Sequence, residues 1–283
     1  MSAVASPTLS ARAVMPQARR ENFPVASRLL PRAIRSHLLA TYGFARMVDD
    51  AGDEAPGDRL ALLDSLERDL ERAFDGTPEH PLLVRLQVTV AACDLPIEPF
   101  RRLIEAGRSD QAVHRYETFE DLLGYCALSA NPVGELVLGV FGLATPERIR
   151  LSDAVCSGLQ LVEHWQDISE DYRRGRIYLP AQDRERFGVG EADLETGPPT
   201  SALRRLMAFE VTRARSLLDE GAPLTATVRG RPRIAVAAFV AGGRSALRAI
   251  ERSDYDVLGS APRPSAAARV RELVATLREQ RSK

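Results

Sequence analysis

Residues 160–180, QLVEHWQDISEDYRRGRIYLP, contain the strongest indication of the fold. Acidic and amide side chains recur there at steps of three and four residues, on one face of an α-helix: Gln160, Glu163, Asp167 and Asp171. Arginines follow directly at positions 173, 174 and 176. The pattern predicts a helix with a carboxylate face and a basic end.

A second helix carries a similar face in residues 42–54, YGFARMVDDAGDE. Its members are Tyr42, Arg46, Asp49 and Asp53, while Asp50 points off the face. Two facing carboxylate helices repel each other unless a cation lies between them. Mg²⁺ prefers carboxylate and phosphate oxygens, and arginine binds phosphate in a bidentate manner. The pair predicts a metal-bridged diphosphate in a helical cavity, with two ordinary solvated helix faces as the alternative.

The rest of the chain also has helical periodicity. The expected helices cover residues 35–50, 60–74, 81–93, 99–106, 118–142, 146–172, 201–220 and 232–253, with a short terminal helix ending at Lys283. No alternating strand series and no G-x-G-x-x-G turn appear, so a Rossmann domain is unsupported. Residues 177–199 are expected to be a long connection. We predict an all-α protein, with a flexible arm over residues 1–20 and one helical domain over residues 21–283.

Composition narrows the class of protein. The 283 residues are 45% hydrophobic and carry a net charge of −1, which argues against a nucleic-acid partner. Three scattered cysteines predict neither a disulfide framework nor a zinc site. No run of about 18 uncharged apolar residues predicts a membrane span, and residues 1–20 lack the order of a secretory signal. We therefore expect a cytoplasmic protein.

Taken together, these segments resemble the squalene/phytoene synthase family, which carries a DDxxD stretch and a second acidic stretch before GRxYLP. The matching residues here are 49–53 (DDAGD), 160–171 and 175–180 (GRIYLP). Residues 22–31 (NFPVASRLLP) and 255–258 (YDVL) also match. The resemblance covers about residues 21–258 and implies a class I isoprenoid synthase helical bundle with a central cavity.

Three details are most similar to the hydroxysqualene-forming branch of the family: residues 21–27 (ENFPVAS), 125–134 (YCxxSANPVG) and 165–167 (WQD). This implies that presqualene diphosphate and water give hydroxysqualene and diphosphate, assisted by Mg²⁺ and without a nicotinamide cofactor. It also implies functional coupling to a presqualene diphosphate synthase and to a hydroxysqualene reductase, in squalene and hopanoid biosynthesis. The apolar substrate leaves peripheral contact with the inner face of the membrane open.

The resemblance also implies roles for individual residues. Metal binding is expected of Asp49, Asp50, Asp53, Glu163, Asp167 and Asp171. Diphosphate binding is expected of Asn22, Tyr42, Arg46, Gln160, Gln166, Arg176 and Tyr178, with Tyr42 and Arg46 also catalytic. Glu163 and Gln166 depart from the family, which has asparagine and arginine there. For Arg46, an ion pair with Asp50 inside the helix is the alternative.

The SANP segment is expected to break a helix, because Pro132 cannot donate the helical hydrogen bond. Asn131 beside this break is a catalytic candidate that would hold the water capturing the carbocation. His164 and Trp165 are expected to be packing residues, with a catalytic base and a cation-facing ring as the respective alternatives. No residue is identified as the acceptor of the proton that the water loses, and released diphosphate is an equal candidate.

Two other functions remain as alternatives. A head-to-head prenyl synthase would make presqualene diphosphate or phytoene from two allylic diphosphates. A family member without catalysis would serve as an assembly or scaffold protein, although the retained aspartates on both helices argue against it. Oligomeric state and product stereochemistry do not follow from the sequence.

Overall fold

The computed structural model describes residues 30–53, 55–195, 197–259 and 261–279. These residues form helices without a strand, apart from one isolated bridge between Arg115 and Ile177, and the all-α prediction is confirmed. The helices are α2 (Arg32–Asp53), α3 (Arg59–Asp75), α4 (Pro81–Cys93), α5 (Glu98–Ser109), α6 (Phe119–Ser129), α7 (Asn131–Val140), α8 (Pro146–Gln166), α9 (Ile168–Arg173), α10 (Ala181–Phe187), η1 (Glu191–Leu194), α11 (Ser201–Gly221), α12 (Leu224–Thr227), α13 (Gly230–Arg252) and α14 (Ala266–Glu279). The predicted arm lies outside the described residues.

Local chemistry explains several helix boundaries. Thr118 starts α6 with a capping box, in which its hydroxyl accepts from the Asp121 amide and the Asp121 carboxylate accepts from the Thr118 amide. Thr145 and Thr200 cap α8 and α11 in the simpler way, each accepting one backbone hydrogen bond. These caps fix where α6, α8 and α11 begin.

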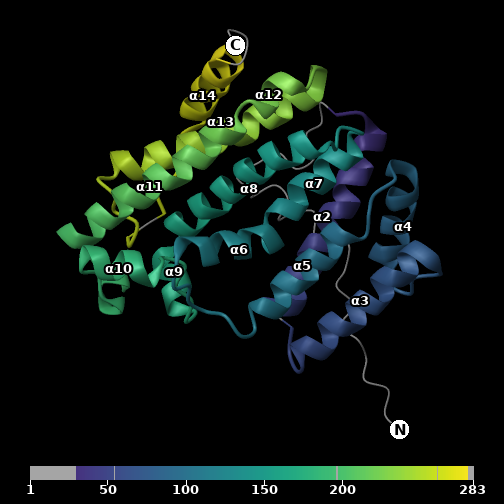
Figure 1. The fold of residues 1–283 in the computed structure, drawn as a ribbon, viewed down its shortest axis with the longest axis horizontal. Coiled ribbons are helices and arrows are strands. Elements are labelled where there is room, and N and C mark those ends of the chain that lie inside the picture. The colour runs from purple at the N-terminus through teal and green to yellow at the C-terminus, as the bar shows by residue number, and fades with distance from the viewer. Residues whose placement is uncertain (1–29, 54, 196, 260, 280–283) are drawn as a thin grey trace.

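The bundle has two large hydrophobic cores. One is formed mainly by α2 to α5 and α7, around Phe44, Leu83 and Phe100. The other is formed mainly by α6, α8, α11 and α13, around Trp165 and Leu206. In Figure 1, α3 and α4 lie on one side of the molecule and α11 and α13 on the other, with α6, α7 and α8 between them. The helices that carry the predicted site therefore meet where the two cores join.

Two helical segments end earlier than predicted. The run over residues 118–142 is broken at Ala130 into α6 and α7, and Pro132 lies in the first turn of α7, as the SANP motif predicts. The run over residues 146–172 stops at Gln166, with Asp167 between α8 and α9. The prediction of one continuous acidic helix there was wrong. Residues 177–199 also contain α10 and η1 rather than an unbroken connection.

One stretch, Phe119–Val140, is long and apolar enough to cross a membrane by length and composition alone. The sequence analysis did not identify this stretch because it required a run of residues without charge, and the stretch contains Glu120, Asp121 and Glu135. This is weak evidence for a span, since α6 and α7 pack against each other and against α5 and α8.

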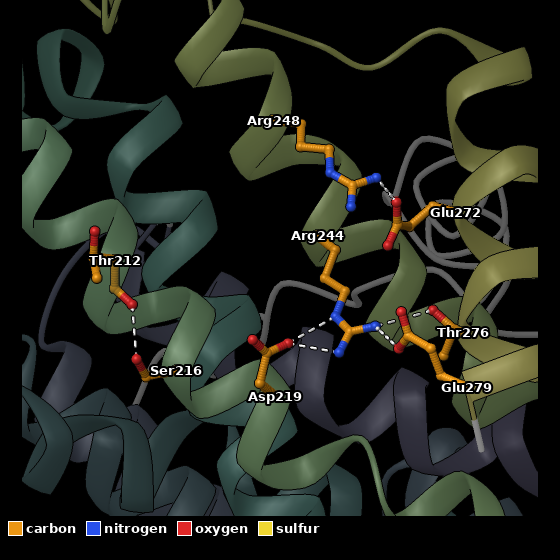
Figure 2. Close-up of polar contacts among 8 residues, drawn as sticks. All are labelled: Thr212, Ser216, Asp219, Arg244, Arg248, Glu272, Thr276 and Glu279. Atoms are coloured by element: carbon orange, nitrogen blue, oxygen red, sulfur yellow. Dashed lines mark hydrogen bonds and ion pairs between the residues drawn. The ribbon is translucent and has the colours of Figure 1, made fainter. Parts of the chain in front are cut away.

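The C-terminal helix α14 packs on α13 through ion pairs. Figure 2 shows Arg244 of α13 between Asp219 of α11 and Glu279 of α14, at 2.6 and 2.9 Å. Arg248 pairs with Glu272, whose side chain is buried against α13. The network ties three helices of the C-terminal half together.

Candidate active site

An acidic pocket lies at the junction of the two cores. Its volume, including the open mouth, is about 340 Å³. The pocket is lined by α2, α5 and the first residues after α5, and α6: Val48, Asp49, Gly52, Asp53, Leu103, Ala106, Gly107, Asp110, Tyr125 and Ser129. Carboxylates lie beside the apolar side chains Val48, Leu103 and Ala106, an arrangement that can hold a charged group against an apolar one.

Asp49 and Asp53 enter the pocket from successive turns of α2, as predicted. The Gln111 amide holds α2 against α5 by donating to the carbonyl oxygens of Gly52 and Gly107, at 2.9 and 3.0 Å. The Asp49 side chain is exposed to solvent, but the surrounding protein atoms partly desolvate its carboxylate. This desolvation raises the pKa of Asp49 to about 7, with Arg46 lowering it and Asp53 raising it further.

Asp110 is a pocket carboxylate that sequence reasoning missed. It follows α5 and lines the cavity with Asp49 and Asp53. The Tyr125 hydroxyl donates to Asp110 Oδ2 at 3.1 Å, and burial raises the pKa of this carboxyl. Asp110 belongs to no acidic stripe, so the only available signal was Tyr125 in the motif of residues 125–134.

Arg176 connects the second acidic segment to the pocket. Its Nη2 lies 2.6 Å from Asp53 Oδ1, across 123 residues of sequence. The Arg176 loop is fixed on residues 114–116 because the Ile177 amide donates to the His114 carbonyl at 2.8 Å. Arg115 also donates to the Gly175 carbonyl at 3.2 Å and pairs with Glu191. Arg176 is thus placed beside carboxylates rather than in solvent.

The second acidic segment is bent at Asp167, which ends α8. The Asp171 amide still donates to the Asp167 carbonyl at 2.8 Å, so both carboxylates stay near each other. Desolvation, with a further contribution from Asp167, raises the pKa of Asp171 to about 7. Glu163 is half-buried one turn before Asp167. Arg176 lowers the pKa of Asp171, which places this segment within electrostatic range of the pocket.

Aromatic rings pack behind Arg176. The Tyr178 ring stacks on His164 with centroids 3.6 Å apart and on Tyr116 at 5.7 Å. All three side chains are buried, and desolvation lowers the pKa of His164 to about 3. His164 is therefore neutral, with its Nε2 lying 3.1 Å from the Gln160 amide nitrogen. Trp165 is completely buried, as expected of a packing residue.

Several predicted residues have other partners. Gln166 is buried, and its amide donates to the Pro262 carbonyl, which anchors the segment before α14; its role in diphosphate binding stays a prediction. Arg46 pairs with Asp50 at 2.7 Å, the alternative considered for both. The side-chain Oδ1 of Asn131 accepts from the Ser157 hydroxyl at 2.9 Å, fixing the α6–α7 break to α8. Tyr42 is half-buried on α2, and Asn22 lies outside the described residues.

The donor set fits Mg²⁺ in its chemistry. Asp49, Asp53 and Asp110 present hard oxygen atoms to one pocket, and desolvation disfavours the charged form of Asp49 and Asp110. Within the described ranges, no three His, Cys, Asp or Glu side chains form a ready metal cluster. That agrees with how Mg²⁺ binds, through one or two carboxylates, waters and substrate phosphates rather than a complete protein cage.

The fold and this site define a helical isoprenoid synthase, and residues 17–271 match the family model described as squalene/phytoene synthase. The chain belongs to this family of enzymes of isoprenoid biosynthesis.

Three similar proteins of this family carry the names of different enzymes. The chain is 37% identical to the hydroxysqualene synthase of Rhodopseudomonas palustris, covering 75% of this chain and 72% of the other. It is 34% identical to the 15-cis-phytoene synthase of Synechococcus elongatus, covering 84% and 82%. The crystal structure of squalene synthase HpnC from Alicyclobacillus acidocaldarius superimposes with a TM-score of 0.78 at 46% identity, covering 87% of this chain and 95% of the other.

Proposed function

We propose that the protein converts presqualene diphosphate and water into hydroxysqualene and diphosphate. The observation that carries this proposal is the acidic pocket of Asp49, Asp53 and Asp110, with Arg176 bound to Asp53 at 2.6 Å. Such a site suits a substrate whose leaving group is diphosphate. The hydroxysqualene synthase relative and the motif of residues 125–134 favour this member of the family's reactions.

Asp49, Asp53 and Asp110 of the pocket, with Asp167 and Asp171 of the second acidic segment, would hold Mg²⁺, which would supply positive charge to the departing diphosphate. Arg176 would pair with the same group, and a planar guanidinium suits phosphate oxygens. The carbon–oxygen bond of the substrate breaks and its electron pair leaves with diphosphate. The apolar side chains of the wall, Val48, Leu103 and Ala106, would shield the resulting cyclopropylcarbinyl cation while it rearranges. Water would then add its oxygen to the cation and give one proton to the released diphosphate.

The buried aromatic stack packs behind Tyr125, which lines the pocket and lies 6.0 Å from the Tyr178 ring. Tyr178 and His164 leave little room for movement at a centroid distance of 3.6 Å. The neutral His164 ring adds no positive charge beside Arg176, so it does not compete for the substrate's anionic end. We assign both residues to holding the shape of the site.

Head-to-head condensation is the second candidate, and the 34% identical phytoene synthase supports it. This reaction joins two allylic diphosphates and therefore needs room for two diphosphate groups. Gln166, at the position where the family has arginine, brings no cation of that kind to this site. This difference favours the reaction of a single diphosphate.

The test is to give purified protein presqualene diphosphate or farnesyl diphosphate, each with Mg²⁺, and to analyse organic extracts by mass spectrometry. We expect a C30 alcohol from presqualene diphosphate alone, abolished by a chelator. In ¹⁸O-water the hydroxyl oxygen should carry the label. Consumption of farnesyl diphosphate alone would assign the protein to the condensing branch, and turnover of neither substrate would favour a scaffold role.

A further inference from the structure

Arg176 occupies a position that competes with a bound cation. Its guanidinium contacts Asp53 at 2.6 Å, and Asp53 lines the pocket together with Asp49 and Asp110. The exposed fraction of the Arg176 side chain is 17%, so the guanidinium is largely enclosed by the site. A buried positive charge beside several carboxylates neutralises the repulsion that they would otherwise impose on the folded chain.

Carboxylates from three parts of the fold surround this guanidinium. Asp53 and Asp110 both raise the pKa of Arg176, and Arg176 in turn lowers the pKa values of Asp110 and Asp171. Asp53 comes from α2, Asp110 from the end of α5 and Asp171 from α9. Arg176, on the loop after α9, reaches Asp53 of α2 at 2.6 Å and so links the second acidic segment to the first.

The backbone around Arg176 is fixed by hydrogen bonds to the neighbouring residues 114 and 115. Bonds from the Ile177 amide to His114 and from Arg115 to the Gly175 carbonyl fix the loop. A long arginine side chain on a fixed backbone can exchange one anionic partner for another without moving the loop. Diphosphate offers the same bidentate partner as a carboxylate, with more charge.

We propose that Arg176 is a resting latch, which pairs with Asp53 in the substrate-free protein and transfers to the diphosphate when metal and substrate bind. The latch rests on the proposed metal-assisted function and adds its regulation. Free metal alone binds weakly because Arg176 holds Asp53, while metal with diphosphate binds well because the diphosphate draws Arg176 away. The metal ions and Arg176 therefore act together on one group only when a diphosphate is bound.

The test measures binding of Mn²⁺, a paramagnetic probe, by EPR to the full-length protein, with and without inorganic diphosphate. Arg176→Gln should bind Mn²⁺ alone about tenfold more tightly than wild type, which corresponds to roughly 1.4 kcal/mol. The same variant should bind diphosphate about tenfold more weakly at saturating Mn²⁺. Arg176→Lys, which keeps the charge, should stay close to wild type for Mn²⁺ alone.

Arg173→Gln is the matched control. It removes the same charge three residues earlier, from an exposed residue whose Nε donates to the Ser169 carbonyl at 3.1 Å. Its effect on Mn²⁺ alone should be less than about threefold, because screening weakens an exposed charge. In an Asp53→Asn background, the gain from Arg176→Gln should disappear. Thermal melts of each variant establish that the comparison is between folded proteins.

The possible failures are distinguishable. Equal effects of Arg176→Gln and Arg173→Gln, or weaker Mn²⁺ binding by Arg176→Gln, would overturn the latch and leave the proposed function standing. A wild-type protein that binds no Mn²⁺ even with diphosphate present would overturn the metal-assisted function, and the latch with it.

Discussion

At the residue scale, Asp110 is a pocket carboxylate that a motif search does not find. It lies in no acidic repeat, yet it shares a pocket with Asp49 and Asp53 and accepts the Tyr125 hydroxyl at 3.1 Å. The structure therefore adds one carboxylate to the two that the α2 stripe predicts.

We expect Asp110→Asn to lower turnover of the diphosphate substrate by roughly 10–100-fold, because it removes a charge that faces the pocket. The melting temperature should change little, since asparagine keeps the shape and can still accept from Tyr125. Steady-state assays with the substrate identified by product analysis test this. Asp94→Asn is the control, because Asp94 is exposed and its positive φ of 50° is tolerated by asparagine. Equal loss in both variants would contradict the assignment.

At the element scale, α10 and α11 are joined by a buried acidic cluster outside the site. Arg213 of α11 lies 2.6 Å from Asp183 of α10 and 3.5 Å from Glu210, whose side chain is fully buried. Burial raises the pKa of Glu210 to about 8, with Arg213 lowering it and Asp183 raising it. This cluster anchors the segment that follows the Arg176 loop.

The raised pKa makes stability depend on pH. Between the ordinary glutamate value of 4.5 and about 8, the folded chain keeps a proton that the unfolded chain has lost, so the free energy of unfolding falls as pH rises. Glu210→Gln removes this loss. We expect it to raise the melting temperature at pH 8 by roughly 2–4 °C more than at pH 5. Glu185→Gln, on the exposed face of α10, should show no such difference, and a gain of the same size at both pH values would refute the explanation.

Close helix packing gives a second element-scale prediction. A Cβ added at Gly221, the last residue of α11, would lie 2.5 Å from Val155 Cγ2 and 2.6 Å from the Leu151 carbonyl oxygen of α8. Because the carbonyl cannot rotate away, Gly221→Ala should destabilise the fold by roughly 1–3 kcal/mol. Gly124→Ala in α6 meets nothing within 4 Å and should be neutral or slightly stabilising in denaturant titration. A neutral Gly221→Ala would mean that α11 can shift freely on α8.

At the scale of the whole molecule, α14 is held to the bundle through charged side chains more than through a deep apolar face. Val270 and Val274 point to solvent, while Glu272 and Thr276 face α13 and are buried. Arg244 joins this helix to α11, as Figure 2 shows.

Arg244→Gln should therefore loosen α14 without unfolding the site. We expect hydrogen exchange of the α14 amides to become about tenfold faster, while α2 and α8 keep their protection. Arg150→Gln is the control, since Arg150 and its partner Glu220 are both mostly exposed. Faster exchange across the entire bundle would show that α14 is part of the global folding unit instead.

Local sequence patterns predicted most of the helices because helical periodicity and caps act over a few residues. The predicted bounds of α4 agree with the structure, and those of α3 and α11 differ by one residue. The break at Ala130 followed from Pro132. The end of α8 at Asp167 did not follow, because nothing in the local sequence there stops a helix. The same patterns identified Asp49 and Asp53, whose types and spacing indicate metal chemistry, whereas Arg176 was singled out by the resemblance to the family.

The sequence by itself determined an all-α chain of this family with two carboxylate segments, since these properties depend on short-range spacing. Only the tertiary structure decided which side chains meet. The contact of Arg176 with Asp53, the entry of Asp110 into the pocket and the turn of Gln166 toward Pro262 each join residues from different helices or loops. Such contacts depend on how helices cross and on where bends fall, and no local propensity encodes those angles.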